Sequence, residues 1–479
     1  MAKFKPYQAG QPHLLPPSLE DYVPKGHLAR VVYEAVERLD TRAIEEKYSE
    51  KGQHTYHPKV LLKLLFYGYA TGVRSGRKIA TRCESDTAYM YLGETYQPDF
   101  RTINDFRKNH LREIENFFVE VVRLCQELGM VKAGSISIDG TKMRANAAAR
   151  RSRTKEGYEK WEKKIEEQIR GMLREAEETD AAEDREYGDT RGDEIPKELH
   201  EKEQLRKKIQ EAYQRIQHEK EKRNLTDGDS RFMKDGQGKI KPGYNCQIAV
   251  TDAQVIVAAD VVMEPNDRKQ LMPMLHHAQE TTGEKVTEVL ADSGYANYDT
   301  YEALEQEEIT GYIPDQYFAQ KNHGVYDAPD KRYHRENFRY DAAQDVYWCP
   351  EGKVLRLYKE RDSDDGVVKR KQWIYKGSAC GTCPKRAQCT TARYRTLARE
   401  KREECQERMR VRLVSAEGKQ RYGKRLFTVE PIFGHLKKNL GYRDFLLRSI
   451  EKVRGEFKLM CIGYNLMKYW HRKVAMAAG

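Results

Sequence analysis

The chain of 479 residues has few cysteines and no long apolar run. Nine cysteines are too few for a disulfide scaffold at this length, so we expect a reduced, cytoplasmic protein. The most apolar stretch, residues 60–70, contains Lys63 and is far shorter than the roughly 20 residues that a membrane-spanning helix needs. The first ten residues lack the apolar segment of a secretory signal, and the mean hydropathy is −0.88. These absences argue against a membrane protein.

Several catalytic motifs are also missing. The sequence contains no GxxxxGK[ST] phosphate-binding loop, no HExxH zinc-protease helix and no GxSxG nucleophile elbow. Tyrosine is abundant, with 30 residues, but no arginine and histidine pattern around any of them indicates a tyrosine recombinase. P-loop ATPases, zinc proteases of this type and serine hydrolases of this type are therefore excluded.

The positive charge is concentrated in the last quarter of the chain. The net charge is +11, from 86 Lys and Arg and 75 Asp and Glu. Residues 366–479 contain 28 of the basic and 9 of the acidic residues, a net +19, which leaves −8 for residues 1–365. A basic segment on a nearly neutral body indicates a polyanionic partner, most simply nucleic acid. The alternative is a solvated basic face on an ordinary enzyme.

Residues 1–130 are predicted to be mostly helical. Apolar residues at helical spacing indicate helices within 57–72, 75–93 and 99–129, separated by Gly-containing turns. Such short helices are typical of a helix-turn-helix arrangement, whose last helix meets DNA. The front of that helix would present Arg101, Asn104, Arg107 and Lys108. A plain helical bundle with a polar face is the alternative.

Strand patterns follow and predict a mixed α/β sheet. Residues 134–149 indicate a strand that ends at Asp139-Gly140, and residues 239–264 indicate a β-hairpin. A helix over 268–283 and a short buried strand that ends at Asp292 come next. The order strand, hairpin, helix, strand favours a mixed α/β sheet.

Two stretches interrupt this pattern. Residues 150–225 combine alternating charges with apolar residues at helical spacing, which predicts an antiparallel helical hairpin inserted into another domain. Residues 300–425 show no persistent period, and we interpret them as a second insertion that ends in a basic helical stretch.

Three acidic residues are notable for their positions. Asp139 and Asp292 end strands, where open α/β sheets place their chemistry, and Glu430 opens a helix over 428–442 inside the basic quarter. Carboxylates among basic residues suit Mg²⁺ or Mn²⁺ beside a phosphate backbone. The alternative is that the three acids cap turns and a helix. Four neighbouring residues could line the same site, although packing or turn roles are the first expectation for them: Asn266, Asp267, Tyr295 and Asn297.

Four of the cysteines form a further cluster. Cys380 and Cys383 make a CxxC pair, with Cys389 six positions on and Cys349 thirty-one positions before. Four thiolates from two short loops can hold a structural Zn²⁺. Because Cys349 has no CxxC partner of its own, free thiols stay an equal alternative, and a redox motif is a third.

Sequence motifs surround all three acidic residues. They are SIDGTKMRANA around Asp139, VLADSGYAN around Asp292 and RYGKRLFTVEPIFGHLKKNLGYRDFLLR around Glu430. Together they resemble the DDE transposases of bacterial insertion sequences, in the IS1182-like branch of the IS4-type group. The last motif matches that group's signature Y-x2-R-x3-E-x6-K, except that four residues separate Arg425 from Glu430. Residues 56–111 resemble the helical N-terminal domain of these transposases.

The resemblance implies an RNase H-like catalytic core over 134–470, a mixed sheet flanked by helices, preceded by a helical DNA-binding domain over 1–130. It implies that the three acids bind two Mg²⁺ or Mn²⁺ ions and catalyse DNA cleavage and strand transfer. The residues that would contact DNA phosphates are Lys437, Lys438, Arg425 and Tyr422. The partners would be double-stranded DNA, as terminal inverted repeats and target, and a second copy of the chain in a synaptic complex in the bacterial cytoplasm.

Two other functions stay open at this point. One is a transposon-derived DNA-binding protein without catalysis, and the other is an RNase H-like cellular nuclease with no mobile element. Intact acids at all three positions argue against the first, and inverted repeats on both sides of the gene would argue against the second.

Overall fold

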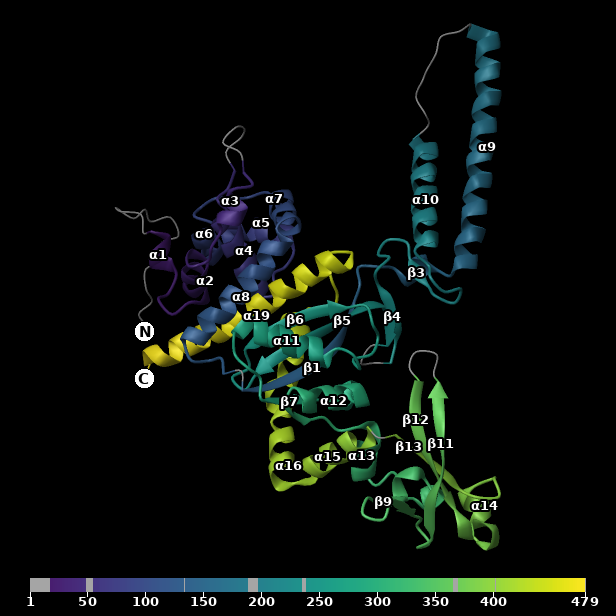
Figure 1. The fold of residues 1–479 in the computed structure, drawn as a ribbon. Coiled ribbons are helices and arrows are strands. Elements are labelled where there is room, and N and C mark those ends of the chain that lie inside the picture. Colours follow the sequence, from purple (N-terminus) through teal and green to yellow (C-terminus); the bar gives the residue numbers. More distant parts are fainter. Residues whose placement is uncertain are drawn as a thin grey trace, which may run out of the picture.

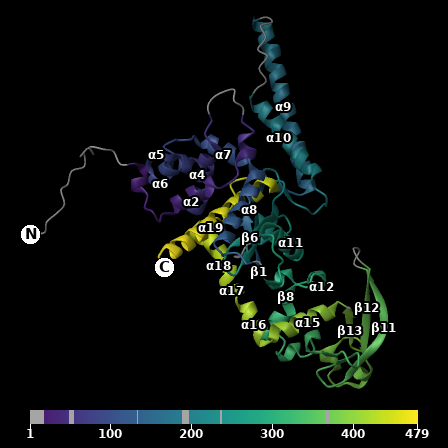
Figure 2. The same ribbon diagram turned by 60° about the vertical axis from the view of Figure 1, so that its left-hand side comes forward.

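The computed structural model describes residues 18–48, 55–132, 134–187, 197–234, 238–364, 369–400 and 402–478. Figure 1 shows a body of helices and a mixed sheet from which two arms extend, a helical hairpin and a separate β-sheet. Figure 2, turned by 60°, shows the same two arms at opposite ends of the body. The start of the predicted N-terminal domain (1–17) and part of the predicted hairpin (188–196) lie outside the described residues.

Eight helices make up the described N-terminal part. They are α1 (Leu19–Tyr22), α2 (Leu28–Glu37), α3 (Arg42–Glu45), α4 (Pro58–Ala70), α5 (Gly76–Ser85), α6 (Thr87–Leu92), α7 (Phe100–Asn109) and α8 (Leu111–Glu127). α4 begins with proline at its first position, where the missing N–H costs no hydrogen bond, and is buried on nearly all sides. The helices predicted within 57–72 and 99–129 are confirmed, and the stretch 75–93 forms two short helices.

The central sheet is mixed, as predicted, with the order β4-β5-β1-β7-β8 and with β6 also paired to β5. Its strands are β1 (Ser135–Arg144), β4 (Arg231–Lys234), β5 (Ile240–Thr251), β6 (Ile256–Val262), β7 (Glu288–Ala291) and β8 (Thr310–Tyr312). β5 is antiparallel to β1 and to β6, whereas β7 is parallel to β1 and β8 is parallel to β7. α11 (Leu271–Thr282) packs on β5 and β6 and confirms the helix predicted over 268–283.

β1 does not end at Asp139, contrary to the prediction from the Asp-Gly pair. The strand continues to Arg144 because every residue from Asp139 onward still pairs with β5. Its pairing with β7, however, stops at Ile138↔Ala291. Asp139 is therefore the first residue of β1 beyond the ladder with β7. The Asp-Gly pair marks the end of this one ladder, not of the strand.

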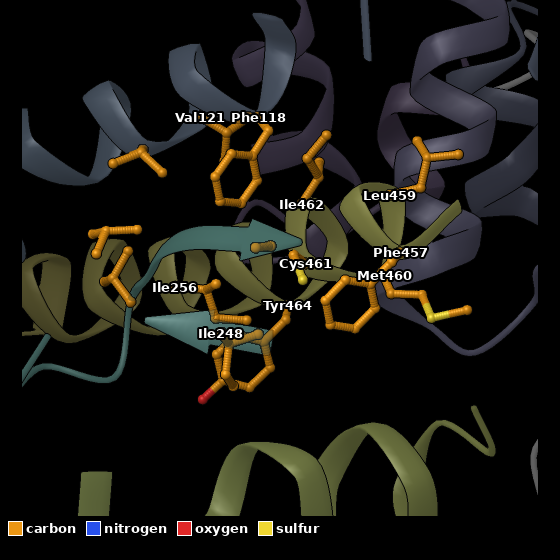
Figure 3. Close-up of a cluster of buried hydrophobic side chains, with 14 of the residues drawn as sticks. Phe118, Val121, Ile248, Ile256, Phe457, Leu459, Met460, Cys461, Ile462 and Tyr464 are labelled. Carbon is orange, nitrogen blue, oxygen red and sulfur yellow. The ribbon is translucent and has the colours of Figure 1, made fainter. Parts of the chain in front are cut away.

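The C-terminal helix α19 (Ile450–Ala478) joins the N-terminal helices to the sheet. It packs against α4 and α8 on one side and against β6 on the other. Figure 3 shows side chains of α8 and of the sheet gathered around Phe457, Cys461 and Tyr464 of α19. One hydrophobic core extends through all of these elements. The predicted domains 1–130 and 134–470 thus share a core, because the last helix of the chain lies between them.

The helical hairpin predicted within 150–225 is confirmed. α9 (Lys155–Tyr187) and α10 (Lys197–Gln214) lie side by side and project from the body (Figure 1). The buried apolar residues of the hairpin, separate from the main core, are Tyr158, Ile165, Ile169, Leu199, Ile209, Ala212 and Ile216. Two short strands at its base, β2 (Ser152–Arg153) and β3 (Arg223–Asn224), pair and close the arm.

The insertion predicted over 300–425 covers fewer residues in the structure. β8 pairs with β7 and is therefore part of the central sheet. α12 (Tyr298–Gln306), α15 (Glu403–Val414) and α16 (Ala416–Gly423) pack against β8, and α15 packs on the other two helices, so they flank that sheet. The separate part is a five-stranded antiparallel sheet, ordered β13-β12-β11-β10-β9. Its strands are β9 (Arg339–Asp341), β10 (Val346–Trp348), β11 (Val354–Asp364), β12 (Lys369–Gly377) and β13 (Thr396–Glu400).

No helix within the described ranges is long and apolar enough to cross a membrane.

Candidate active site

Two of the predicted acids lie next to each other at one edge of the central sheet. Asp139 follows Ile138 on β1, and Asp292 follows Ala291, the residue of β7 that pairs with Ile138. Because the two strands are parallel and in register at this point, the two carboxylates occupy neighbouring positions. The Gly294 N–H donates a hydrogen bond of 2.8 Å to the Asp292 carboxylate, which holds that side chain against its own turn.

Glu430 reaches the same place through Arg425. The helix predicted over 428–442 is shorter than predicted: it begins as α18 (Glu430–Gly434), right after α17 (Arg425–Thr428), and ends with the π-helical turn η6 (His435–Asn439). The Arg425 guanidinium lies 3.0 Å from Asp139 Oδ1 through Nη2 and 3.0 Å from Glu430 Oε1 through Nη1. The guanidinium therefore joins Glu430 to Asp139, and Asp292, beside Asp139 on the neighbouring strand, also acts on its charge.

A hydroxyl pair fixes this helical segment on the sheet. Ser137 of β1 and Thr428 of α17 are both buried and lie 2.8 Å apart, oxygen to oxygen. Thr428 follows Arg425 by three residues, and Ser137 precedes Asp139 by two. The hydrogen bond thus fixes the position of α17 along β1, and with it the position of Arg425 relative to the carboxylates.

The charges at this site are strongly coupled. Burial raises the pKa of Asp139 to about 6, Arg425 opposes that rise, and the nearby Asp292 adds to it. Burial alone would lower the pKa of Arg425, but Asp139 and Asp292 outweigh burial and raise it, so the guanidinium stays charged. Asp139 is 14% exposed and Arg425 10%, whereas Glu430 is 42% exposed and forms the open side of the site.

Lys437, Lys438 and Tyr422 occupy three different settings. The Lys437 ammonium donates hydrogen bonds to the Thr141 hydroxyl and, at 3.0 Å, to the Lys142 carbonyl, so it ties η6 to β1 just beyond Asp139. Lys438 is exposed on the same turn. Tyr422, near the end of α16, is half-buried beside Arg425, and burial raises the pKa of its hydroxyl.

Asp267 is a fourth carboxylate at this edge of the sheet. It is 19% exposed and lies 3.1 Å from the Lys142 ammonium. It also accepts hydrogen bonds of 2.7 Å from the side-chain amides of Asn245 and Gln247 on β5. The sequence alone favoured a packing or turn role for Asp267, whereas the structure places it in the polar network of the site.

Two glycines allow Asp267 to come this close. A Cβ on Gly140 would lie 2.9 Å from Asp267 Oδ1, and a Cβ on Gly294 would lie 3.4 Å from Oδ2. Each glycine follows one of the predicted acids within two residues. Tyr295 is fully buried and its hydroxyl donates to Gln247, which extends the network inward.

The two other polar residues named from the sequence, Asn266 and Asn297, border this network: both line a pocket with Asp267 and Gly294, and Asn297 donates a hydrogen bond of 3.1 Å to the Tyr295 carbonyl. Asn297 caps α12 through Thr300, which confirms the structural role expected first, and Asn266 is exposed in the loop before Asp267.

Two family profiles match the chain. The profile of the transposase DDE domain matches residues 348–470, which include Glu430, and the profile of the transposase domain DUF772 matches residues 17–109. This combination is the signature of IS1182-family transposases. The chain belongs to the DDE transposases. Neither a curated protein nor a solved structure matches the transposase.

The DNA-facing role predicted for α7 of the transposase needs a correction. Arg107 is buried, and its guanidinium donates hydrogen bonds to the Tyr69 hydroxyl at 3.0 Å and to Asn104 Oδ1 at 3.0 Å. Asn104 also packs on α5, where a Cβ on Gly76 would lie 2.5 Å from its Oδ1. Arg101 and Lys108 are exposed. Of the four predicted residues, two therefore hold the helical domain together and two remain on its surface.

A basic groove of the transposase lies where β1 leaves the sheet and was not found from the sequence. Exposed arginines from two stretches meet there, because Arg144 of β1 bonds to the backbone of Arg443. The groove itself is lined by Arg150, Arg151 and Arg448. The run RRSRTK that begins at Arg150 is a local signal for it, but only the fold brings residues 443–448 beside it.

The four cysteines of the predicted zinc cluster line a single cavity in the separate β-sheet of the transposase. Burial raises the pKa of the Cys389 thiol, Arg395 opposes that rise, and the other three thiols add to it. All four are free thiols. Within the described residues, no group of three or more His, Cys, Asp or Glu side chains is already arranged to hold a metal ion, at these thiols or at the acids.

Proposed function

We propose that this transposase, of the IS1182 type, binds the ends of its insertion sequence and catalyses metal-dependent DNA cleavage and strand transfer. The observation that supports this most directly is that three distant parts of the chain meet at one place: Asp139 and Glu430 both contact Arg425, and Asp292 lies beside Asp139. The strand order β6-β5-β1-β7-β8, with three antiparallel strands followed by two parallel ones, supports an RNase H-like core.

The donor set suits magnesium or manganese. Asp139, Asp292 and Glu430 offer only carboxylate oxygens, the ligands that hard divalent cations prefer. The Arg425 guanidinium, which bridges two of these carboxylates, is a positive group at the place where a metal ion would bind. When bound, two such ions activate an attacking water or 3′-hydroxyl and stabilise the leaving oxygen.

The chain's own residues would position the DNA backbone around these acids. Arg425 would donate to a phosphate oxygen at the open side formed by Glu430, and Tyr422 would support the guanidinium. Lys438 is exposed on the turn that Lys437 holds against β1, so it is placed to contact the next phosphate. Lys142 is engaged by Asp267, and we assign these two residues to positioning the edge of β1.

The basic groove would hold the duplex beyond the cleavage point. Arg144, Arg150, Arg151, Arg443 and Arg448 form a positive surface at the end of the strand that contains Asp139. Such contacts are to phosphates, so binding through them falls steeply with salt. Arg101 and Lys108 on α7 would add a second contact from the N-terminal helices. Joining two transposon ends would require at least two copies of the chain in a synaptic complex. This reaction would take place on chromosomal DNA in the bacterial cytoplasm.

A cleavage assay on labelled DNA that contains the element's own ends tests this proposal. We expect strand cleavage that requires Mg²⁺ or Mn²⁺, and a loss of roughly a hundredfold or more in Asp292→Asn, because several kcal/mol of charge stabilisation depend on the ions. Asp260→Asn is the matched control, since Asp260 also lies on the central sheet but pairs with Arg454 at 2.8 Å. End binding by Asp292→Asn in a mobility-shift assay shows that the variant is folded.

The outcomes separate the alternatives. Binding to the ends without cleavage by the wild type would indicate a transposon-derived DNA-binding protein. Cleavage without preference for the ends would indicate a cellular nuclease. Cleavage by Asp292→Asn at the wild-type rate would show that the proposed site is wrong.

A further inference from the structure

The separate β-sheet has very little hydrophobic core. Its hydrophobic cluster contains five buried apolar side chains, Phe338, Tyr347, Leu355, Tyr375 and Leu397, and Val346 and Ile374 on its strands are also buried. Every residue of β11 from Arg356 to Asp362 is exposed, and five of these seven residues are charged. Modules with so few buried apolar groups are generally stabilised by a disulfide or a structural metal. The structure shows no disulfide among its nine cysteines, all of which lie in the described residues.

The four clustered cysteines come from two turns that meet at one end of this sheet. Cys349 follows β10, whereas Cys380 lies in the 3₁₀ turn η5 (Ser378–Thr382), Cys383 follows that turn, and Cys389 ends α14 (Arg386–Cys389). Together they line a cavity of about 30 Å³. That volume has room for one small guest. Figure 1 shows α14 at the far end of this arm, well away from β1 and β7.

The backbone is shaped around two of the thiols. The Lys353 N–H donates to Cys349 Sγ at 3.3 Å, and this tight turn is completed by Gly352, whose φ of +69° is in the left-handed region. A Cβ on Gly377 would lie 2.5 Å from Cys380 Sγ, so glycine is needed for this thiol to sit against β12. In proteins, hydrogen bonds to a ligand atom and close packing of this kind orient the side chains that bind a metal ion.

The charge around the cavity suits a thiolate site. Three basic residues, Lys353, Arg386 and Arg395, and one acidic residue, Glu351, line it together with the cysteines, so the lining side chains other than the thiols carry a net +2. Four thiolates and one divalent cation leave a net charge of −2, which these cations offset. Hard ions such as Mg²⁺ are excluded by sulfur ligands, whereas Zn²⁺ binds four cysteines tetrahedrally.

We propose that Cys349, Cys380, Cys383 and Cys389 bind one Zn²⁺ ion that holds the two turns of the separate β-sheet together. Each thiol loses its proton on binding, so the four cysteines bind as thiolates and release four protons to solvent. The thiol side chains turn about their Cα–Cβ bonds to reach tetrahedral positions. This site is independent of the catalytic acids and of the function proposed above.

The zinc would secure the arm without holding the body. Ion pairs connect the arm to α15, through Arg335 to Glu403 at 2.7 Å and through Arg399 to Glu407 at 2.6 Å. The central core has no cysteine of this cluster. Removing zinc therefore loosens the residues between about 329 and 400, while the core that contains Asp139 and Asp292 stays folded.

Metal content of the purified full-length chain tests the proposal. Elemental analysis of protein prepared under reducing conditions and reconstituted with Zn²⁺ should give about one zinc per chain. Cys383→Ser should lose it, whereas the control Cys405→Ser should retain it, because Cys405 is also partly exposed but contacts Glu305 on α12 instead of the cavity. Zinc in the wild type no higher than in Cys383→Ser would overturn the proposal.

A second measurement covers the case in which Cys383→Ser does not fold. Co²⁺ added to metal-free wild-type protein should produce the intense d–d absorption of tetrahedral cobalt thiolate, and Zn²⁺ should remove it. Chelation should also expose the arm, and not the body, to limited proteolysis. Iron in place of zinc, a disulfide between any two of the four cysteines under reducing conditions, or a cobalt spectrum without thiolate bands would each refute zinc binding.

Discussion

Replacing Asp139 by asparagine should stabilise the metal-free transposase at neutral pH. The carboxylate of Asp139 is 14% exposed, and burial raises its pKa from the ordinary value of 3.8 to about 6 even with Arg425 beside it. Because one pKa unit corresponds to about 1.36 kcal/mol, ionising Asp139 costs the folded state roughly 3 kcal/mol. Asparagine has nearly the same shape, can still accept a hydrogen bond from Arg425 and avoids this cost.

The gain should depend on pH with a defined sign. The folded state takes up a proton on Asp139 near pH 6, whereas the unfolded chain does so near pH 3.8. Folding therefore binds a proton between these values, and the free energy of unfolding of the wild type falls as the pH rises from about 4 to about 6. Asp139→Asn lacks this loss, so its advantage should be small at low pH and approach about 2–3 kcal/mol above pH 7.

Urea denaturation in the presence of EDTA, at several pH values between 5 and 8, measures this difference. Glu430→Gln is the matched control, since it removes the same charge and the same 3.0 Å contact with Arg425 from a side chain that is 42% exposed. The control should change stability by no more than about 0.5 kcal/mol. A less stable Asp139→Asn at pH 7.5, or an advantage that does not change between pH 5 and 7.5, would refute the reasoning. The variant should not cleave DNA, as expected where a functional group destabilises its own fold.

Three other substitutions have definite expected outcomes. Arg425→Gln should bind Mn²⁺ more tightly in equilibrium dialysis, by roughly ten- to 150-fold, because the ion no longer displaces a charge-assisted hydrogen bond worth about 1.5–3 kcal/mol; weaker binding than wild type would contradict the bridge. Asp267→Asn turns an acceptor of three donors into a partial donor, so it should lower the free energy of unfolding by about 1–3 kcal/mol and slow cleavage while DNA binding persists; unchanged cleavage would remove Asp267 from the site. Gly463→Ala places a Cβ 2.6 Å from the backbone of Tyr69, so it should lower the free energy of unfolding, measured by thermal denaturation, by about 1–3 kcal/mol. Gly171→Ala, which has open space around it, should raise that free energy by up to about 1 kcal/mol. Equal effects of the two substitutions would contradict the close approach of α19 to α4.

Much of the local structure could be predicted from the sequence because it depends on short-range patterns. The helical spacing in α4 and α8, the hairpin of β5 and β6 and the two charged helices α9 and α10 are all visible in patterns of residues that are close together in the sequence. The predicted bounds of the insertion over 300–425 were wrong because its strands contain many charged residues and lack the alternation of apolar and polar residues that marks a strand. β11 is exposed from Arg356 to Asp362 and β12 contains four lysines and arginines among its nine residues, so no apolar alternation marks either strand.

The candidate site was predictable only in part. The three acids could be chosen because each lies in a short motif next to a strand or a helix start. The burial of Arg107 could not be predicted, because its partners, Tyr69 on α4 and Arg74 in the turn after it, meet α7 only through tertiary packing. The same reason applies to Asp267, whose donors come from another strand.

The sequence alone indicated the family, the helical N-terminal part and the mixed sheet, and it predicted the three candidate acids. Tertiary structure alone decided that Arg425 lies between Asp139 and Glu430, that the four cysteines share one cavity and that α19 joins the two predicted domains into one core. Each of these facts depends on contacts between residues far apart in the chain, which form only when apolar faces are buried against each other. Local patterns of charge and hydrophobicity specify those faces but not which of them meet.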